Sequence, residues 1–408
     1  MDRVILHCDL NNFFASVSLL YSQTLLDEPV AVAGSVENRH GIILAKNEIA
    51  KKYGVKTAEP IFKAKQKCPN LFILPPMYDK YEEFSKKAQE IYRRYTDMVE
   101  PFGMDECWLD VTGSNLLFGD GKTIGNRIRE DIKRELGITA SVGVSFNKVF
   151  AKLGSDMKKP DALTEITKEN FKEKVYPLPV SDLLFVGKST ADILRRRGIF
   201  TIGDLSRVEE ITVRKLLGKN GVLLRQYALG EDNSPVCTPK KTDLPKSIGR
   251  SRTLSFDLEN EKEVWGEFLL YAEEIAQKLR EKELYAYGVQ ITIRNTDLTS
   301  KEFASHIDSG TQTGITLARE AMRLFRLNGS LPCRNVGLRA IHLRSGIRAV
   351  QTDIFSSLER DEKEQRIEEE ITDICSRFGE NKLTRGVLLK RKNSYSSGKS
   401  LPGYITRR

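Results

Sequence analysis

Apolar residues recur along the chain with the periods typical of helices and of strands. Short apolar runs predict strands over residues 4–8, 29–33, 42–45, 71–74 and 140–145, and two more flank a turn at 103–106. A short helix is predicted over 12–21. Two longer helices, one over 78–96, are predicted from apolar residues at helical spacing: Tyr81, Phe84, Ala88, Ile91 and Tyr95 in the first, and Ile124, Ile128, Ile132 and Leu136 in the second.

Without an insert at 11–76, the first part of the chain follows the order strand, helix, strand, strand, helix, strand. This is the ferredoxin-like βαββαβ arrangement, in which the first and third strands are antiparallel neighbours at the centre of the sheet. Asp9 ends the first of these strands, and Asp105 and Glu106 begin the third. We therefore expect three carboxylates, almost a hundred residues apart in sequence, to converge at one edge of the sheet.

The later part of the chain predicts further domains, so the fold class is α+β and multidomain. Residues 178–234 are helical in pattern and rich in Gly, Lys and Arg, and residues 235–246 resemble a linker. A second βαββαβ order follows over 247–347, with strands near 248, 289–293, 300–304 and 336–343 and helices over 262–281 and 314–325. The tail, 348–408, predicts one amphipathic helix with an apolar face of Ile367, Ile371, Ile374 and Phe378, and then a basic end.

Composition restricts the class of protein. The chain has 408 residues, of which 40% are hydrophobic and 30% charged, as in a globular protein. Its six cysteines are scattered, which argues against a zinc site or a disulfide framework and indicates a reducing cytoplasm. No apolar run approaches the ~20 residues that a membrane span needs, and no signal peptide is expected.

The net charge of +9 admits a polyanionic partner, but its distribution weakens that argument. Eight Lys and Arg against one acid lie from Gly379 to the C-terminus, whereas residues 359–373 are acidic. Charge alone therefore does not show that the main body of the chain binds nucleic acid.

The three carboxylates suit the chemistry of phosphoryl transfer. Two-metal sites bridge the attacking and leaving oxygens, and Mg²⁺ prefers oxygen ligands and takes one or two carboxylates per ion. Taken from the residues alone, a solvated Asp-Glu turn and an unrelated strand-end aspartate stay open as the alternative.

Three long segments carry a resemblance to a known family. HCDLNNFFASV (7–17), GMDECWLDVTG (103–113) and SFNKVFAKLGSDMKKPDA (145–162) together resemble the palm and finger signatures of Y-family DNA polymerases. The resemblance implies a right-hand polymerase with palm (1–10 and 77–177), fingers (11–76), a helix-hairpin-helix thumb (178–234), a linker (235–246) and a little finger (247–347).

The resemblance also implies roles for individual residues. Asp9, Asp105 and Glu106 match the catalytic metal ligands, and the backbone carbonyl of Leu10 matches a further ligand. Phe14 matches a steric gate that excludes the 2′-hydroxyl of a ribonucleotide; a core aromatic is the alternative from composition. The remaining nucleotide-binding positions are Phe13, Lys51 and Lys159, the last of which matches a triphosphate-binding lysine.

Several positions depart from the family's usual pattern. Glu48 and Lys51 stand where a finger helix often carries Tyr and Arg, and Lys51 lacks the bidentate fork of Arg. Asn11 replaces a second Asp common in the polymerase IV group, and Gly103 stands where Ser is usual. Asn11 and the AKNxxAK pattern are closer to the polymerase V catalytic subunit, so the subgroup stays open. Phe185 occupies a usual glycine position of the thumb hairpin.

The partners expected from the resemblance are primer–template DNA, dNTP and a bacterial sliding clamp. KSIGRSRT (246–253) resembles the start of the little finger, where Lys and Arg follow the template backbone. QTDIF resembles a clamp-binding peptide in which Gln351 makes a polar contact and Ile354 and Phe355 are apolar anchors; a strand-end apolar pair is the alternative. We expect a monomer apart from the clamp.

The implied function is template-directed, low-fidelity DNA synthesis across damaged templates, without proofreading, using two Mg²⁺ ions or Mn²⁺. Two alternatives are another metal-dependent enzyme on a ferredoxin-like palm, such as a nucleotide cyclase, and a non-catalytic scaffold that binds DNA and the clamp. The first would not need the hairpin or the second βαββαβ domain. The second would not need all three carboxylates.

Overall fold

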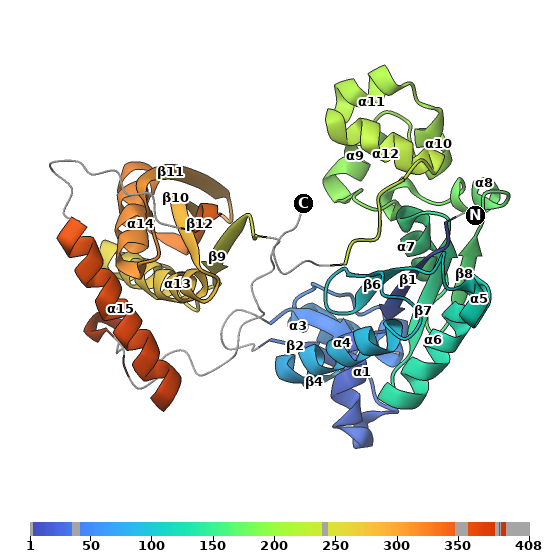
Figure 1. Ribbon diagram of the computed structural model, residues 1–408, viewed down its shortest axis with the longest axis horizontal. Helices are drawn as coiled ribbons and strands as arrows, with labels where there is room; N and C mark the ends of the chain where they lie inside the picture. Colours follow the sequence, from blue (N-terminus) through green and yellow to red (C-terminus); the bar gives the residue numbers. More distant parts are fainter. Residues whose placement is uncertain are drawn as a thin grey trace. The chain divides into compact units, whose positions relative to one another are not determined.

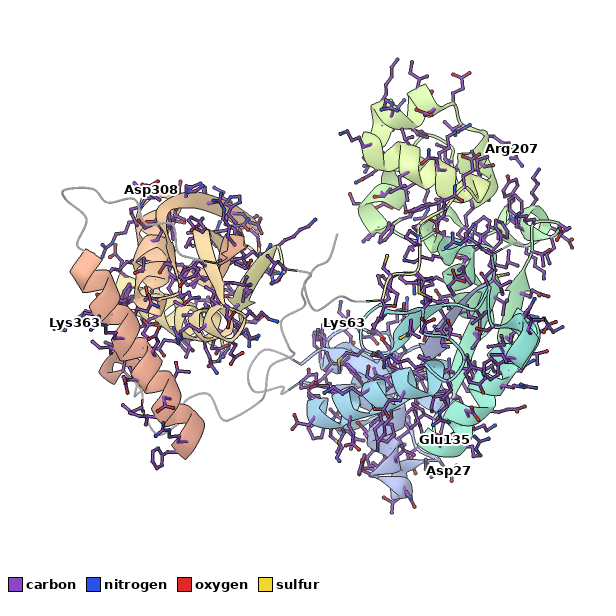
Figure 2. The ribbon with its side chains drawn as sticks, viewed as in Figure 1. Asp27, Lys63, Glu135, Arg207, Asp308 and Lys363 are labelled. Atoms are coloured by element: carbon purple, nitrogen blue, oxygen red, sulfur yellow. The ribbon has the colours of Figure 1, made fainter. Side chains whose placement is uncertain are left out.

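The computed structural model describes residues 3–34, 41–238, 244–346, 358–379, 383 and 385–388. These residues form two compact units, one ending at residue 238 and the other beginning at 244, and each is treated by itself. In Figure 1 the first unit runs from blue to yellow-green and the second from yellow to red. Charged side chains such as Lys63, Arg207 and Asp308 project outward from the ribbons (Figure 2). None of the described helices is both long and apolar enough to span a bilayer.

The first unit is built on a five-stranded sheet that contains the predicted ferredoxin-like order. Its central strand β1 is antiparallel to β6 on one side and to β7 on the other, as the prediction required. A fifth strand, β8, which the sequence did not predict, is parallel to β7 and extends the sheet. Across the sheet the strands are β5 (Val99–Pro101), β6 (Glu106–Asp110), β1 (Ile5–Leu10), β7 (Ala140–Ser145) and β8 (Leu163–Ile166).

Both faces of this sheet, which lies in the segment expected to be the palm, are covered by helices. One face packs on a core shared with the two predicted amphipathic helices, α4 (Tyr78–Tyr92) and α6 (Gly121–Leu136). The other face is covered by α7 (Lys148–Met157), which leads from β7 to β8. A Cβ at Gly143 would lie 1.8 Å from the backbone oxygen of Ala151, so only glycine permits α7 to approach this closely. The helix is thereby fixed directly against the strands that carry the acids.

The segment expected to be the fingers forms a separate small layer around a core of its own. Their three strands were all predicted: β2 (Val30–Ala33) lies between β3 (Ile43–Lys46), which is antiparallel to it, and β4 (Phe72–Leu74), which is parallel. The helices of this region are α1 (Phe13–Leu20), α2 (Glu48–Lys52) and α3 (Ile61–Lys67).

The segment expected to be the thumb is helical and shares a hydrophobic core with the outer side of α7. At the start of its first hairpin, Phe185 has φ 68°, a left-handed backbone conformation that favours glycine. The family's usual glycine therefore has a conformational reason, and phenylalanine there costs on the order of 1–3 kcal/mol. The thumb helices are α9 (Lys188–Arg195), α10 (Ile202–Arg207), α11 (Glu210–Leu217) and α12 (Lys219–Leu229); two short helices, α5 (Asn115–Phe118) and α8 (Phe171–Val175), belong to the palm region.

The second unit has the predicted βαββαβ order but a different sheet from the palm. Its last strand lies between the first and second, in the order β11-β10-β12-β9. The strands β10 and β11 are longer than predicted. The unpredicted part of β11, residues 305–311, is mostly polar, so no apolar run marks it. The elements are β9 (Ser247–Ser251), α13 (Glu261–Glu281), β10 (Leu284–Asn295), β11 (Ser300–Thr311), α14 (Gly314–Asn328) and β12 (Cys333–Ser345).

The predicted tail helix is present as α15 (Leu358–Phe378), and its apolar face is only partly buried, since Ile371 and Ile374 are half-buried. Ile367 and Phe378 are 46% and 66% exposed, whereas Glu368 is 5% exposed. The Glu368 carboxylate accepts hydrogen bonds from the N–H groups of Gly314 and Ile315 at the start of α14, and from two arginines, Arg280 and Arg385. The side chain of the α14 N-cap residue makes no capping bond, so Glu368 supplies the missing acceptor and holds α15 by charge.

Candidate active site

The predicted juxtaposition of acids follows from the register of two strands. Asp9 lies directly opposite Glu106 in the antiparallel pairing of β1 with β6. The neighbouring residues continue this pairing, because the Leu10 N–H donates a hydrogen bond to the Asp105 carbonyl oxygen at 3.0 Å. All three acids therefore lie at one edge of the palm sheet, on the residues where the strands begin and end.

Asp9 is buried next to a lysine from beyond the end of α7. Its side chain accepts a hydrogen bond from Lys159 Nζ at 2.7 Å, and Lys159 also contacts Asp156 at 2.9 Å. Burial and the neighbouring charges of Glu106 and Asp105 raise the pKa of Asp9 to about 7, even though Lys159 acts in the opposite direction. Burial also disfavours the charged form of Lys159, but the Asp9 carboxylate outweighs it and raises the pKa of that lysine.

The other two acids sit in different electrostatic surroundings. Burial, followed by the charge of Glu106, raises the pKa of Asp105 to about 6. Burial disfavours the charge of Glu106 as well, but contacts with His7 and Lys152 outweigh it and lower the pKa of Glu106 to about 2. Lys152 Nζ donates to Oε2 of Glu106, and His7 Nε2 lies 3.3 Å from the same oxygen.

The donor set fits a hard divalent cation. It consists of carboxylate oxygens, which Mg²⁺ and Mn²⁺ prefer, and burial together with the neighbouring carboxylate charges raises the pKa of two of them, Asp9 and Asp105. Among the described residues, no group of three or more His, Cys, Asp or Glu side chains is arranged to hold a metal ion. Asp9 and Glu106 are paired with lysines instead. The Leu10 side chain is buried in the palm core, so a contribution from Leu10 is limited to its backbone carbonyl.

The two phenylalanines at the start of α1 have different surroundings. Phe14 is partly exposed, and its ring stacks on Tyr81 with 4.2 Å between centroids and 10° between planes. Phe13 is 2% exposed in the palm core, so only its backbone can approach a nucleotide. In α2, Lys51 is exposed and pairs with Glu48 at 3.4 Å, and Glu48 also accepts a hydrogen bond from Asn12.

Three polar residues near the acids were not assigned roles by the sequence analysis. His7 shares the face of β1 that carries Asp9, and strand alternation was the signal for it. Lys152 lies on α7, whereas Lys159 follows the end of that helix, so helical spacing does not connect the two lysines. Asn11 accepts hydrogen bonds from the Asp161 N–H and the Thr139 hydroxyl and donates to Ser141. An aspartate could not make that donation, which gives the departure at Asn11 a structural reason.

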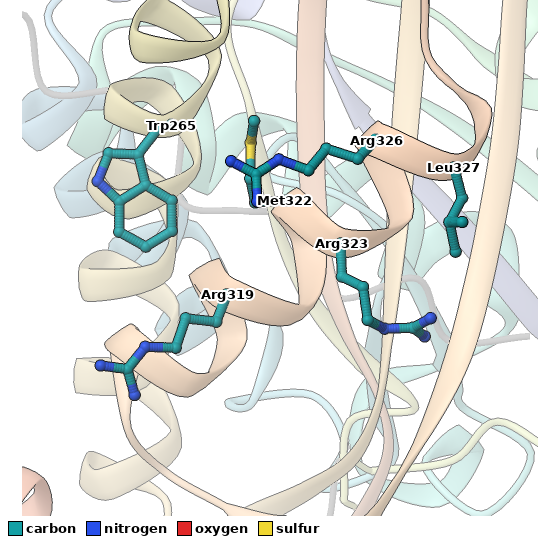
Figure 3. A pocket seen from close by; sticks show the side chains of 6 residues that line it. All are labelled: Trp265, Arg319, Met322, Arg323, Arg326 and Leu327. Atoms are coloured by element: carbon teal, nitrogen blue, oxygen red, sulfur yellow. The ribbon is translucent and has the colours of Figure 1, made fainter.

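A hollow on the second unit carries positive charge but offers no comparable site. Figure 3 shows Arg319, Arg323 and Arg326 on α14, with Trp265 opposite them on α13. Each arginine already pairs with a carboxylate, those of Glu364, Glu320 and Glu261 respectively. Because these charges are balanced, we assign no phosphate-binding role to this hollow.

Comparison with known proteins gives consistent matches over the whole chain. Residues 8–156 match the impB/mucB/samB family, and residues 245–354 match the C-terminal domain of that family. DNA polymerase IV of Acetivibrio thermocellus is 48% identical over 393 residues, which cover 96% of this chain and 98% of that protein. DNA polymerase IV 1 of Bacillus subtilis is 35% identical, covering 98% and 96%. A solved Y-family DNA polymerase chimera has a TM-score of 0.74 at 23% identity, covering 84% of this chain and 100% of that one.

A ferredoxin-like sheet with acids at one edge, a cationic helix behind it and a small fingers layer is the architecture of a polymerase palm. The chain belongs to the impB/mucB/samB family, the Y family of DNA polymerases, and it is a template-directed, low-fidelity DNA polymerase of translesion synthesis. The cyclase-like and scaffold alternatives do not hold for a member of this family. Both relatives are named polymerase IV, although Asn11 had favoured the polymerase V group.

The raised pKa values predict how pH controls metal binding. Asp9 and Asp105 must be ionised to bind a metal, so Mn²⁺ affinity should fall as pH falls through about 7 and then about 6, by about tenfold per pH unit for each proton displaced. Without metal, the stability of the fold depends on pH in the opposite direction. A raised carboxyl pKa stabilises the fold at acid pH, and this contribution is lost as pH rises through about 7.

The measurement is the Mn²⁺ dissociation constant by electron paramagnetic resonance, together with thermal unfolding with and without Mn²⁺, across this pH range. The control is thermal unfolding of the Asp9→Asn variant without Mn²⁺, which should lose the step near pH 7. A Mn²⁺ affinity that is independent of pH would contradict the prediction.

Proposed function

We propose that Asp9, Asp105 and Glu106, with the Leu10 carbonyl, hold two Mg²⁺ ions at the palm edge, and that Mn²⁺ can replace them. Bound there, the ions would lower the pKa of the primer 3′-hydroxyl and neutralise the triphosphate. The observation that carries the proposal is the pairing of Asp9 with Glu106 in a buried setting that disfavours carboxylate charge. The chain's part is to hold these oxygens in place while the hydroxyl attacks and pyrophosphate leaves.

The same proposal assigns the nucleotide to the space beside α1 and the fingers. Lys159 changes partners from Asp9 to a phosphate oxygen when metal takes the carboxylate, because its side chain already reaches the acid site. Lys51, exposed on α2, provides a second charge for the triphosphate. The Phe14 ring lies against the sugar, and contact by Phe13 is through its backbone.

Primer–template DNA is expected along the palm, the thumb hairpin and the little finger. The hairpin offers backbone N–H groups at the start of α9, and Arg250 and Arg252 of the segment 246–253 pair with Glu274 in the second unit. We expect a chain that acts as a monomer in the cytoplasm.

Loss of one carboxylate should abolish catalysis without abolishing DNA binding. Asp9→Asn, Asp105→Asn and Glu106→Gln keep the side-chain shape but remove a metal-binding charge, so each should lower kcat by roughly a thousandfold or more, ~4 kcal/mol of barrier. The measurement is single-nucleotide primer extension alongside binding of labelled primer–template. Asp110→Asn, on the same strand as Glu106 but at its far end, is the matched control. Near-normal turnover by Glu106→Gln would remove that residue from the site.

Truncation of the steric gate should admit ribonucleotides. In Phe14→Ala the 2′-hydroxyl no longer meets the ring, so the ratio of kcat/KM for dNTP to that for rNTP of the same base should fall by roughly tenfold or more, ~1.4 kcal/mol of discrimination. Phe13→Leu is the control, since this buried neighbour should affect stability and leave the ratio unchanged. If the ratio is the same in Phe14→Ala as in the wild type, the ring has no part in sugar selection.

We also propose that Gln351, Ile354 and Phe355 bind a bacterial sliding clamp. These residues lie outside the described part of the chain, and the proposal rests on the sequence QTDIF and on its position between β12 and α15. A tether to a ring around DNA replaces affinity by effective concentration, commonly millimolar for a short connection.

The double variant Ile354→Ala with Phe355→Ala tests this contact. It should leave unaided primer extension unchanged and eliminate the stimulation given by a loaded clamp, because the two apolar anchors are lost. Stimulation that survives in the double variant would place the clamp contact elsewhere in the chain.

A further inference from the structure

One oxygen of Glu106 is held by Lys152 and lies close to the side chain of His7. Lys152 Nζ donates to Oε2, and His7 Nε2 lies 3.3 Å from Oε2. Among the described residues, no hydrogen bond or ion pair involves Oε1 of Glu106. The carboxylate therefore has one oxygen fixed by the protein and one oxygen available.

Lys152 is itself fixed by its neighbours. Its side chain is 15% exposed, its ammonium group lies 5.4 Å from the centre of the Phe102 ring, and Asp156 is 3.9 Å away on the next turn of α7. Because Gly143 lets α7 pack directly on the sheet, this lysine has little freedom to move relative to β6. Its position is a property of the palm and not of a mobile surface chain.

His7 is locked into the same arrangement through α7. Ser155 Oγ donates to the Lys152 carbonyl oxygen at 2.7 Å, so this hydroxyl accepts a hydrogen bond from His7 Nδ1 at 2.8 Å. The edge of the imidazole packs against Trp108, with 5.2 Å between ring centroids. One turn of α7 thus sets both groups that touch Glu106, one through the Lys152 side chain and the other through Ser155.

We propose that Lys152 is a positioning residue for catalysis: it holds Oε2 of Glu106, with His7 at its side, so that Oε1 is presented to a divalent cation. The inference rests on the proposed role of Glu106 as a metal ligand and names the group that orients it. Outer partners of a ligating carboxylate typically contribute 10–100-fold to metal affinity or activity.

A simpler role for Lys152 predicts the opposite change in Mn²⁺ affinity when the lysine is removed. If its ammonium only balanced charge in the metal-free site, its removal would relieve repulsion and Mn²⁺ would bind more tightly. If it orients Glu106, its removal leaves the carboxylate free to rotate and Mn²⁺ binds more weakly. The direction of the change therefore decides between the two roles.

The test compares Lys152→Met with Lys148→Met. Methionine keeps the length of the chain and removes the charge. Lys148 is a matched control because it lies one turn earlier on α7, is 12% exposed and pairs with Glu100 instead. Mn²⁺ affinity is measured by electron paramagnetic resonance on the complex with a dideoxy-terminated primer–template and the correct dNTP. Thermal unfolding of both variants reports any loss of stability.

We expect Lys152→Met to weaken Mn²⁺ binding and lower kcat by about tenfold or more, with KM for dNTP unchanged, and high Mg²⁺ to restore part of kcat. Lys148→Met should leave both quantities unchanged, and Lys152→Arg should recover part of the loss. Tighter or unaltered Mn²⁺ binding in Lys152→Met would overturn the proposal.

A double variant separates this inference from the proposed function. In a Glu106→Gln background, Lys152→Met should have no further effect on Mn²⁺ affinity, because the group that it orients is gone. Equal effects of Lys152→Met with and without Glu106 would refute the positioning role. If Glu106→Gln alone binds Mn²⁺ and turns over normally, the metal-ligand assignment itself fails.

Discussion

The antiparallel pairing of β1 with β6 places like charges together where water is scarce. Asp9 lies opposite Glu106, and Asp105 precedes Glu106, so repulsion and burial both act against ionisation. The fold meets this cost by packing α7 on the same face of the sheet, at a distance that Gly143 alone allows. Lysines on and just after α7 then neutralise Asp9 and Glu106. The acids, the glycine and the cationic helix form one electrostatic unit, and a divalent ion would enter it by exchange with a lysine.

The sequence predicted those parts of the fold that repeat a period or follow from chain order. The apolar faces of α4 and α6 and the convergence of the three acids are of this kind. Strand β8 was not predicted because its burial alternates over only four residues. The contact between α15 and the start of α14 was not predicted for a different reason. Glu368 lies in an acidic run, and nothing in the local sequence distinguishes it from the neighbouring acids as the carboxylate that binds the start of α14.

For the candidate site, too, chain topology predicted the positions of the acids but not their function. Topology predicted where Asp9, Asp105 and Glu106 meet, but only the resemblance to a family gave them a function, since acids at a sheet edge are common on protein surfaces. The contact of Lys152 with Glu106 could not be predicted from pattern alone. A lysine on a helix is normally solvated, and its contact with Glu106 exists only because α7 lies so close to the sheet. Tertiary distance, which is not encoded in any short segment, is the missing information.

The proposed steric gate depends on close packing in the same way as the proposed metal site. A steric gate discriminates only if its wall cannot yield, because a ring that moves away by an ångström admits the 2′-hydroxyl. The Phe14 ring is backed by Tyr81, which is fully buried and whose hydroxyl is hydrogen-bonded to Ser18 on α1. Movement of Phe14 away from the nucleotide would therefore require α4 to move relative to α1, at the expense of core packing. Discrimination by the proposed gate would therefore depend on the rigidity of the core formed by α1 and α4.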